Sequence, residues 1–373
     1  MSRKNTRIRV DQEGHLEVVD PGFDSVDLLR SVDPSFRVRR SKLVGFTSPG
    51  FLRSRELACG VTAQELRTLP EETLWYIHNA LVNRLRNNET SHQIKEKEVS
   101  LQDLKIELAS RILKHCTLCE NRCGIDRTGG QMGICRLGTE ATVAERFVHI
   151  GEEAPINPSL VLNLAGCGLR CRFCQQNTLL NPSEVDGERL EPSLWSKLAT
   201  KGVRSLSFVG GNPDESLYAI LRFLAAAPKS WKLPIVWNCH GYSTPETLQL
   251  LDGVIDVYVP DLKYGRDECG QRLSGVLNYP ATAKSAIATM LGQKAQVIVR
   301  VLILPGHIDC CHLRSLEHLA TLRKKNLLVS IRGQYCPDWK ISYRDGLLAR
   351  RATVQEVETV RDYAKSLQLP LVE

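Results

Sequence analysis

From residue 159 onward the chain alternates short apolar runs rich in β-branched residues with amphipathic stretches. The apolar runs predict six strands, at residues 159–166, 205–211, 234–241, 254–265, 295–306 and 327–335. The amphipathic stretches predict helices at residues 193–202, 214–227, 244–253, 280–293, 315–326 and 353–368. This regular alternation is typical of repeated βα units and a parallel sheet.

Six consecutive βα units predict an α/β fold, a partial (βα)6 barrel rather than the closed eightfold form. Crossovers between parallel strands are right-handed, so the helices should lie outside and the C-terminal ends of the strands should meet at one mouth. The motifs with cysteine and polar residues follow the predicted strands. We therefore expect these motifs to share the rim of the mouth.

The chain before residue 114 follows a different pattern. Residues 1–55 are polar and interrupted by prolines, whereas residues 60–85 and 95–115 have apolar residues at helical spacing. We divide the chain into a mainly helical N-terminal extension of unknown role, a cysteine-rich metal-binding segment and the barrel, at residues 1–113, 114–158 and 159–373. We expect the extension to cover the mouth.

Composition predicts a globular protein of the cytoplasm. Of the 373 residues, 42% are hydrophobic and 24% are charged. The N-terminus shows no apolar core of signal-peptide length, and no stretch approaches the length of a membrane span. The net charge of +7 and the basic run at 37–42 come without interleaved aromatic residues, so they indicate a solvated surface rather than a nucleic-acid site.

Seven of the thirteen cysteines lie between residues 116 and 174. The cytosol keeps thiols reduced, so clustered cysteines there indicate metal binding or redox chemistry rather than disulfides. The remaining cysteines are expected to fill the core, because free cysteine packs as a small apolar residue. They are Cys59, Cys239, Cys269, Cys310, Cys311 and Cys336.

Cys167, Cys171 and Cys174 follow the first predicted strand with the spacing C-x3-C-x2-C. Iron–sulfur clusters are normally held by four thiolates, so three thiolates would hold three irons of a [4Fe–4S] cluster and leave the fourth iron open. An open coordination position is where a catalytic metal binds its substrate. The alternative is a zinc loop completed by a distant residue.

This motif, with Phe173 before its last cysteine, resembles that of the radical S-adenosylmethionine (SAM) superfamily. The resemblance implies that SAM binds the open iron and receives one electron from the reduced cluster. A 5′-deoxyadenosyl radical then abstracts hydrogen from a substrate, and the protein positions that radical. The resemblance also implies that Phe173 packs near the adenine of SAM.

The segment FVGGNPDES at 208–216 ends the second predicted strand and is similar to the superfamily's Gly-Gly-Glu-Pro motif, which receives the amino group of SAM. The resemblance assigns Gly210, Gly211 and Asn212 to SAM binding. Glycines allow the close backbone approach that a ligand needs here. Asn212 stands where glutamate is usual, and its amide oxygen accepts a hydrogen bond without carrying a charge.

Asp261 and Lys263, in PDLKYG, resemble the Asp-x-Lys motif of activases of glycyl radical enzymes. Strand alternation puts both side chains on one face. The resemblance implies that Lys263 pairs with the SAM carboxylate, while Asp261 orients the lysine or contacts substrate. Asn238, near the end of the third strand, is assigned to the SAM ribose or carboxylate. Arg300 lies mid-strand, where a buried guanidinium needs an anionic partner, and the SAM carboxylate would suit.

A second cluster of cysteines has the spacing C-x2-C-x3-C-x11-C, at Cys116, Cys119, Cys123 and Cys135. Four thiolates complete a metal site. The spacing matches neither the paired C-x2-C zinc pattern nor the usual ferredoxin run, so zinc and an auxiliary iron–sulfur cluster both remain open. With the first motif, this block is similar to a subgroup known as pyruvate formate-lyase activating enzyme-like, over residues 114–373.

We interpret the chain as a radical SAM oxidoreductase of the activating-enzyme type. The resemblance implies a [4Fe–4S] cluster, SAM and an electron donor such as flavodoxin or ferredoxin. The substrate is a backbone glycine of a glycyl radical enzyme or, alternatively, a small molecule or peptide. A non-catalytic zinc protein that binds nucleic acid is the alternative of another class, and it does not explain why these motifs share one predicted rim.

Overall fold

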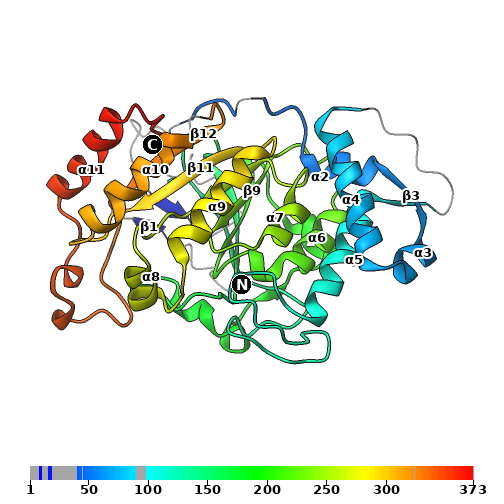
Figure 1. Ribbon diagram of the computed structural model, residues 1–373, viewed down its shortest axis with the longest axis horizontal. Coiled ribbons are helices and arrows are strands. Elements are labelled where there is room, and N and C mark those ends of the chain that lie inside the picture. Colours follow the sequence, from blue (N-terminus) through cyan, green and yellow to red (C-terminus); the bar gives the residue numbers. More distant parts are fainter. Residues whose placement is uncertain are drawn as a thin grey trace, which may run out of the picture.

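The computed structural model describes residues 8–10, 16–18, 40–43, 45–89, 98–322 and 324–372. One sheet runs through the molecule, helices pack along it, and a separate group of helices from residues 50–114 lies at one end (Figure 1). The first three residues of the basic run at 37–42 lie outside the described residues.

Six strands run parallel and in chain order across the sheet. They are β6 (Ser159–Leu164), β8 (Ser205–Gly210), β9 (Ile235–Cys239), β10 (Val257–Pro260), β11 (Gln296–Leu302) and β12 (Leu327–Arg332). The six predicted strands are thus confirmed, although each is shorter than its apolar run. The run at 254–265 is an example, because its last residues form the loop that carries Asp261 and Lys263.

The sheet is wider than predicted, because antiparallel strands extend it beyond β6. They are β1 (Ile8–Val10), β2 (Leu16–Val18), β5 (Thr142–His149) and β7 (Glu188–Arg189). β5 pairs with β6 on one side and with β2 and β7 on the other. Burial does not alternate regularly along β5, so its sequence carries no clear strand period.

Helices follow the parallel strands as the amphipathic stretches predict. They are α6 (Leu217–Ala225), α7 (Pro245–Leu251), α9 (Tyr279–Gly292), α10 (Arg314–Leu322) and α11 (Val354–Ser366), with α8 (Asp267–Ser274) as an addition that we did not predict. In α7, Thr244 caps the N-terminus by accepting a hydrogen bond from the Thr247 N–H at 3.3 Å, and Pro245 occupies the first turn.

The predicted helix at 193–202 is wrong in type. Residues Pro192–Lys197 form a short 3₁₀ helix, and the chain is extended from Leu198. Pro192 fixes the start, and Gly202 turns the chain with a φ of 77°.

The N-terminal extension contains the helices predicted within 60–85 and 95–115, together with a small two-stranded sheet. Its elements are α2 (Gly50–Glu56), β3 (Ala58–Thr62), α3 (Ala63–Thr68), α4 (Glu71–Arg86), β4 (Glu98–Ser100) and α5 (Leu101–Lys114). Two capping boxes, at Thr62 and Ser100, fix the starts of α3 and α5.

The described helices of the extension pack on the outer helices, whereas residues 19–39 and 90–97, to which the prediction of a covered mouth also applies, lie outside the described residues. Lys105 of α5 is fully buried, and its Nζ donates to Leu250 O at 3.0 Å and to Asp252 O at 2.9 Å. Burial lowers the pKa of Lys105 to about 7. Gly50 N donates to Asp256 Oδ1 at 2.9 Å, just before β10. These contacts lie at the N-terminal ends of the strands, opposite the cysteine motifs.

The two faces of the parallel sheet differ in chemistry. One face packs against helices through large residues such as Phe208, which meets Phe223 of α6 edge to face. The other face has a small apolar cluster that includes Val236, Val259 and Ile298. Two residues further along, the same face turns polar, at Asn238 on β9, Asp261 after β10 and Arg300 on β11.

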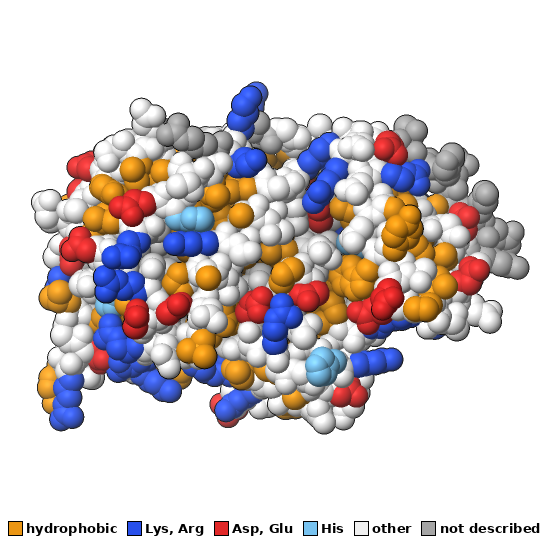
Figure 2. Space-filling view, in the orientation of Figure 1, with side chains coloured by type: hydrophobic (Ala, Val, Ile, Leu, Met, Phe, Trp, Pro, Cys, Tyr) orange, Lys and Arg blue, Asp and Glu red, His pale blue; other side chains and the backbone are white. Residues whose placement is uncertain are grey.

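The surface drawn in Figure 2 carries Lys and Arg side chains interspersed with Asp and Glu. Both signs of charge are therefore present on this face. Within the described ranges, the search for a helix long and apolar enough to cross a membrane finds none.

Candidate active site

The first cysteine motif forms the loop that leaves the C-terminal end of β6. Cys167 is buried, whereas Cys171 and Cys174 are half-buried. Arg170 ties the loop to the end of α8, because its N–H donates to Ser274 O at 3.0 Å. The Arg170 guanidinium also donates back to Cys167 O at 2.6 Å. The loop is therefore held in one conformation at both of its ends.

The side chain of Ser274 links Cys171 to the fold. Its Oγ lies 2.9 Å from Cys171 Sγ and 2.5 Å from Tyr264 OH. Burial raises the pKa of Cys171 and raises that of Cys174 to about 11, while the Lys263 cation opposes both shifts. Buried thiols of this kind ionise when a metal supplies further positive charge. The donor set therefore fits a thiolate-bound cluster.

Gly210 and Gly211 lie where the ends of β8 and β6 meet. Gly211 N donates to Leu164 O at 2.7 Å, and a Cβ added at Gly211 would lie 2.0 Å from Gly166 O. Gly210 has a φ of 107°, which other residues rarely adopt. The close approach of these two strand ends requires both glycines, whichever ligand binds beside them.

Asn212 is buried, and its amide is hydrogen-bonded within the chain at both ends. Its Nδ2 donates to Glu215 Oε2 at 2.5 Å, and its Oδ1 accepts from His240 N at 3.0 Å. These contacts position Glu215 and the end of β9. The Asn212 Oδ1 atom thus already accepts one hydrogen bond, and its predicted contact with the SAM amino group stays a prediction.

Glu215 is the residue that the sequence analysis missed. It is 1% exposed, its Oε1 accepts from Gly168 N at 2.6 Å, and the same oxygen lies 3.3 Å from His240 Nε2. Tyr242 N donates to His240 Nδ1, so Nε2 carries the proton that faces the carboxylate. Burial opposes ionisation, but His240 and Asn212 hold the pKa of Glu215 below its ordinary value. The acidic pair directly after GGNP was the available signal.

Asp261 and Lys263 lie on one side of the chain, as predicted, and pair with each other. Lys263 Nζ donates to Asp261 Oδ2 at 2.5 Å, and both side chains are largely buried. Burial disfavours the charge of Lys263, but Asp261 and Cys171 outweigh it and raise the pKa of the lysine. Tyr279 OH braces the pair by donating to Asp261 O at 2.9 Å.

Arg300 has its anionic partners within the chain. Its Nε donates to Glu153 Oε1 and its Nη2 donates to Glu153 Oε2, both at 2.7 Å, and the guanidinium also pairs with Glu152. The predicted need for an anionic partner is therefore met. The partners in this structure are two carboxylates that precede β6, and the predicted contact of Arg300 with the SAM carboxylate stays a prediction.

Asn238 and Phe173 occupy the positions that their motifs predict. Asn238 is half-buried near the end of β9. Phe173 is buried, and its ring meets that of Tyr335 edge to face with the centroids 5.7 Å apart. Their contacts with SAM stay predictions.

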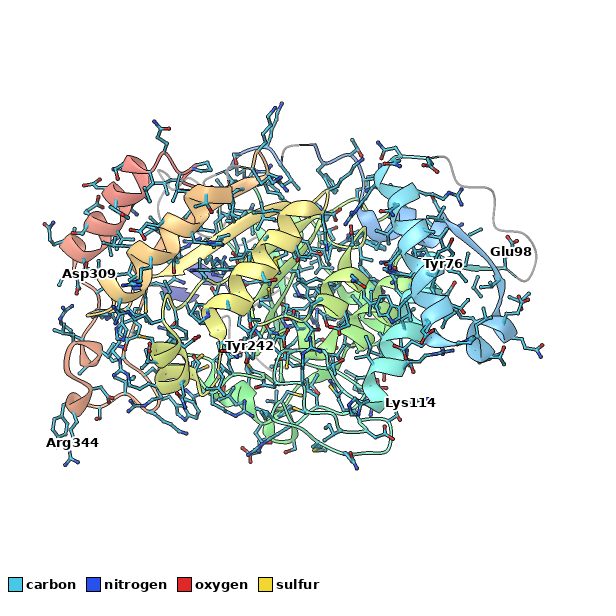
Figure 3. The ribbon with its side chains drawn as sticks, viewed as in Figure 1. Tyr76, Glu98, Lys114, Tyr242, Asp309 and Arg344 are labelled. Carbon is cyan, nitrogen blue, oxygen red and sulfur yellow. The ribbon has the colours of Figure 1, made fainter. Side chains whose placement is uncertain are left out.

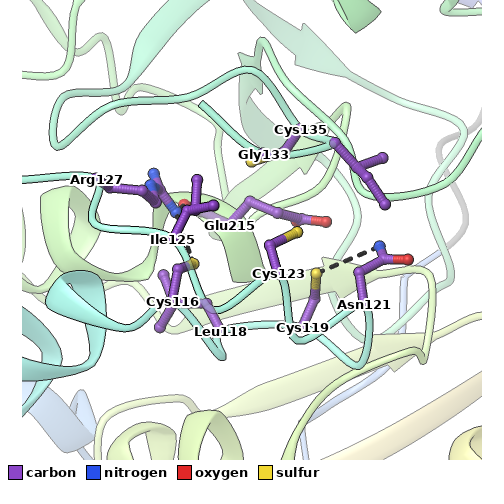
Figure 4. Close-up of a pocket in the computed structure, with 11 residues that line it drawn as sticks. Cys116, Leu118, Cys119, Asn121, Cys123, Ile125, Arg127, Gly133, Cys135 and Glu215 are labelled. Atoms are coloured by element: carbon purple, nitrogen blue, oxygen red, sulfur yellow. Dashed lines mark hydrogen bonds between the residues drawn. The ribbon is translucent and has the colours of Figure 1, made fainter. Parts of the chain in front are cut away.

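The second cysteine segment lines a hollow, together with Glu215 (Figure 4). The hollow has about 310 Å³ of space outside protein atoms, part of it open to solvent. Asn121 Nδ2 lies 3.6 Å from Cys119 Sγ, and Arg127 Nη1 lies 3.8 Å from Cys116 Sγ. All four predicted ligands line the hollow, namely Cys116, Cys119, Cys123 and Cys135.

The segment that carries these cysteines is docked onto the loop after β9. Cys119 forms an antiparallel bridge with Ser243, and Thr247 Oγ1 donates to Leu118 O at 2.7 Å. Figure 3 shows Lys114 at the end of α5, where the chain enters the segment, and Tyr242 in the loop that receives it. The segment therefore joins the extension to the rim of the sheet.

Two groups of described residues have metal-ligating atoms that all lie within 4.8 Å of one another. One is Cys167, Glu215 and His240, and the other is Cys269, Cys310 and Cys311. The second group was not predicted, because α8 and the turn before α10 bring together residues far apart in sequence. Cys269 and Cys311 are buried, as expected of core cysteines, and Cys310 is half-buried.

Comparison with known proteins gives a family. Residues 159–273 match the 4Fe-4S single cluster domain. The uncharacterized protein MJ0674 of Methanocaldococcus jannaschii is 33% identical over 325 residues, which cover 84% of this chain and 93% of the relative.

The similar solved structures align with a smaller share of this chain than MJ0674 does. SuiB of Streptococcus suis bound to S-adenosylmethionine aligns with 14% identity and a TM-score of 0.37, over 57% of this chain and 45% of its own. TYW1 with a lysine-pyruvate adduct aligns with 11% identity and a TM-score of 0.37, over 57% of this chain and 74% of its own. This chain therefore spans less than half the length of SuiB.

The three-thiol loop and the family match define the class. Residues 159–273, which carry the three-thiol loop, match the class of 4Fe-4S single cluster domains, so the cofactor of this class is a [4Fe–4S] cluster. Within the class it belongs to the same family as MJ0674 of Methanocaldococcus jannaschii.

Proposed function

We propose that this protein is a radical SAM oxidoreductase built on a partial (βα)6 barrel, in which Cys167, Cys171 and Cys174 hold the [4Fe–4S] cluster. When bound, the cluster and SAM supply a 5′-deoxyadenosyl radical that abstracts hydrogen from a substrate. The observation that carries the proposal is the meeting of three thiols, the glycine pair after β8 and the Asp261–Lys263 pair at strand C-terminal ends. Ligands of parallel α/β sheets bind at this edge.

The chain's own residues bind and orient SAM. Lys263, held by Asp261, presents a buried cation to the SAM carboxylate. Asn238 hydrogen-bonds the ribose or carboxylate, and Phe173 packs near the adenine. The glycine pair after β8 leaves room for the methionine amino group. Glu215 supports the site indirectly, because it fixes the backbone beside Cys167.

The substrate that we favour is a backbone glycine of a glycyl radical enzyme, in keeping with the similarity to the pyruvate formate-lyase activating enzyme-like subgroup. A small molecule or a peptide is the alternative. The reductant is a low-potential electron donor such as flavodoxin or ferredoxin.

The test is the formation of 5′-deoxyadenosine. Protein reconstituted with iron and sulfide without oxygen, and reduced with dithionite, is incubated with SAM and analysed by mass spectrometry. We expect brown protein and 5′-deoxyadenosine. A colourless protein that contains zinc but no iron would contradict the proposal.

We expect Ser274→Ala to lower the midpoint potential of the cluster. The hydroxyl lies 2.9 Å from Cys171 Sγ, and hydrogen bonds to cluster sulfurs stabilise the more negative reduced state. Ser274→Thr keeps the hydroxyl and is the matched control. Potentiometric titration followed by electron paramagnetic resonance (EPR) measures the potential, and equal potentials for wild type and both variants would refute this role.

A further inference from the structure

The two cysteine sites share one wall. Glu215 lines the hollow of the second site, and its Oε1 accepts from Gly168 N, the residue after Cys167. The Cys167 Sγ, a Glu215 carboxylate oxygen and a His240 ring nitrogen also lie within 4.8 Å of one another. The side chain of Glu215 therefore lies between the Cys167 thiol of the first site and the hollow of the second site.

A direct contact also joins the two cysteine loops. Asn121 Nδ2 donates to Gly168 O at 2.8 Å and lies 3.6 Å from Cys119 Sγ. A Cβ added at Gly168 would lie 3.1 Å from the same Cys119 Sγ and 2.6 Å from Glu215 Oε1. Because residue 168 is a glycine, Cys119 of the second site can pack directly against the backbone of the first cysteine loop.

The spacing of the four thiol sulfurs suits an iron–sulfur cluster better than a single zinc ion. A tetrahedral zinc with Zn–S bonds of about 2.3 Å requires thiolates about 3.8 Å apart. Among the described residues, the ligating atoms of Cys269, Cys310 and Cys311 all lie within 4.8 Å of one another, whereas no three of the four thiols of the second site do so. The three thiols of the first site do not form such a group either, although Cys167 does so with Glu215 and His240. A four-iron cluster is larger than one ion and holds its ligands further apart.

The surroundings of the four thiols also suit an iron–sulfur cluster. Asn121 and Arg127 direct N–H groups at Cys119 and Cys116, and hydrogen bonds to ligand sulfurs tune cluster potentials. A Cβ added at Gly133 would lie 2.9 Å from Cys123 Sγ, so the loop closes tightly over this ligand.

We propose that Cys116, Cys119, Cys123 and Cys135 hold an auxiliary [4Fe–4S] cluster rather than zinc, placed to pass one electron to the cluster at Cys167. The electron-transfer part rests on the proposed function of the first site, whereas the identity of the metal does not. A low-potential one-electron donor reduces the auxiliary cluster, which is reoxidised as the first cluster is reduced. No bond is made or broken in this exchange.

The metal content tests the first part of the proposal. Protein purified without oxygen is analysed for iron, sulfide and zinc, alongside a variant that lacks the first site through Cys167→Ser, Cys171→Ser and Cys174→Ser. We expect about eight irons per chain in the wild type and about four in the variant. Cys123→Ser should lose the auxiliary cluster, while Cys336→Ser, a half-buried cysteine outside both sites, is the control. One zinc per chain and four irons in the wild type would overturn the proposal.

EPR of the reduced protein tests the placement. The variant without the first site should give one cluster signal that does not change when SAM is added, because all four irons have protein ligands. In the doubly reduced wild type, two clusters this close should couple, so its spectrum should be broader than the sum of the two single-site spectra. A spectrum equal to that sum would contradict the placement.

Electron counting tests the exchange. Protein reduced in full, then freed of dithionite, is given SAM, and 5′-deoxyadenosine is counted per chain. The wild type should form about twice as much as Cys123→Ser, because each cluster stores one electron. Equal yields would refute the exchange and leave a structural cluster. An absence of product from both, with two clusters present, would contradict the proposed function and leave the auxiliary cluster established.

Discussion

Cys171→Ala is expected to abolish the formation of 5′-deoxyadenosine and to remove the cluster of the first site. Cys171 is one of three thiols in that site, and its Sγ is also the partner of Ser274. We expect a cluster left with two thiolate ligands to be lost, and the proposed radical chemistry with it. The expected loss of activity is on the order of a thousand-fold or more, down to background. Mass spectrometry of the product and iron analysis measure it.

Cys59→Ala is the matched control for this substitution. Cys59 is buried in the extension, away from both cysteine sites, and it belongs to β3. We expect the control to keep its iron and its activity. If Cys171→Ala made as much product as the wild type, the first motif would not hold the catalytic cluster.

Glu215→Ala is expected to destabilise the fold by about 3 to 5 kcal/mol, the range for breaking a buried charged network. Its carboxylate accepts hydrogen bonds from Gly168 N and Asn212 Nδ2 and faces His240 Nε2. Alanine leaves these donors buried without their acceptor. Because Gly168 follows Cys167, the same substitution should also lower the iron content of the purified protein.

Urea denaturation, followed by circular dichroism, measures the loss of stability, and Glu246→Ala is the control. Glu246 lies on α7, its side chain is 38% exposed and it pairs with Arg122 at 3.4 Å. A surface substitution of this kind changes the unfolding free energy by at most about 0.5 kcal/mol. Similar stabilities for the two variants would show that Glu215 is not a structural centre of the site.

The repeated part of the fold follows from local pattern. Val236, Val259 and Ile298 belong to apolar runs whose length and flanking helices identify parallel strands. Strand β5 does not follow from such a pattern. Its residues pair with β6 antiparallel but are unevenly buried, so only the neighbouring strands decide its place in the sheet.

Some features of the candidate site could likewise be predicted from the sequence, and others could not. The spacing of the first cysteine motif predicts the cluster ligands, and Asp261 and Lys263 pair with each other although they lie in the loop after β10 rather than on a strand. The partners of Arg300 could not be predicted, because Glu152 and Glu153 are far from it in sequence and meet it only across the sheet. Asn212 was assigned by analogy, and its amide turned out to position Glu215.

The sequence by itself predicted which residues carry chemistry, because thiolate spacing and strand alternation are local properties of the chain. It therefore named both cysteine sites and the order of the six parallel strands. Only the tertiary structure decided which carboxylates neutralise Arg300, that Glu215 stands behind Cys167, and that the second cysteine site presses against the first. These contacts join segments that are distant in sequence, so they depend on how the chain packs. Burial also removes water as a competing hydrogen-bond partner, which strengthens the contacts once they have formed.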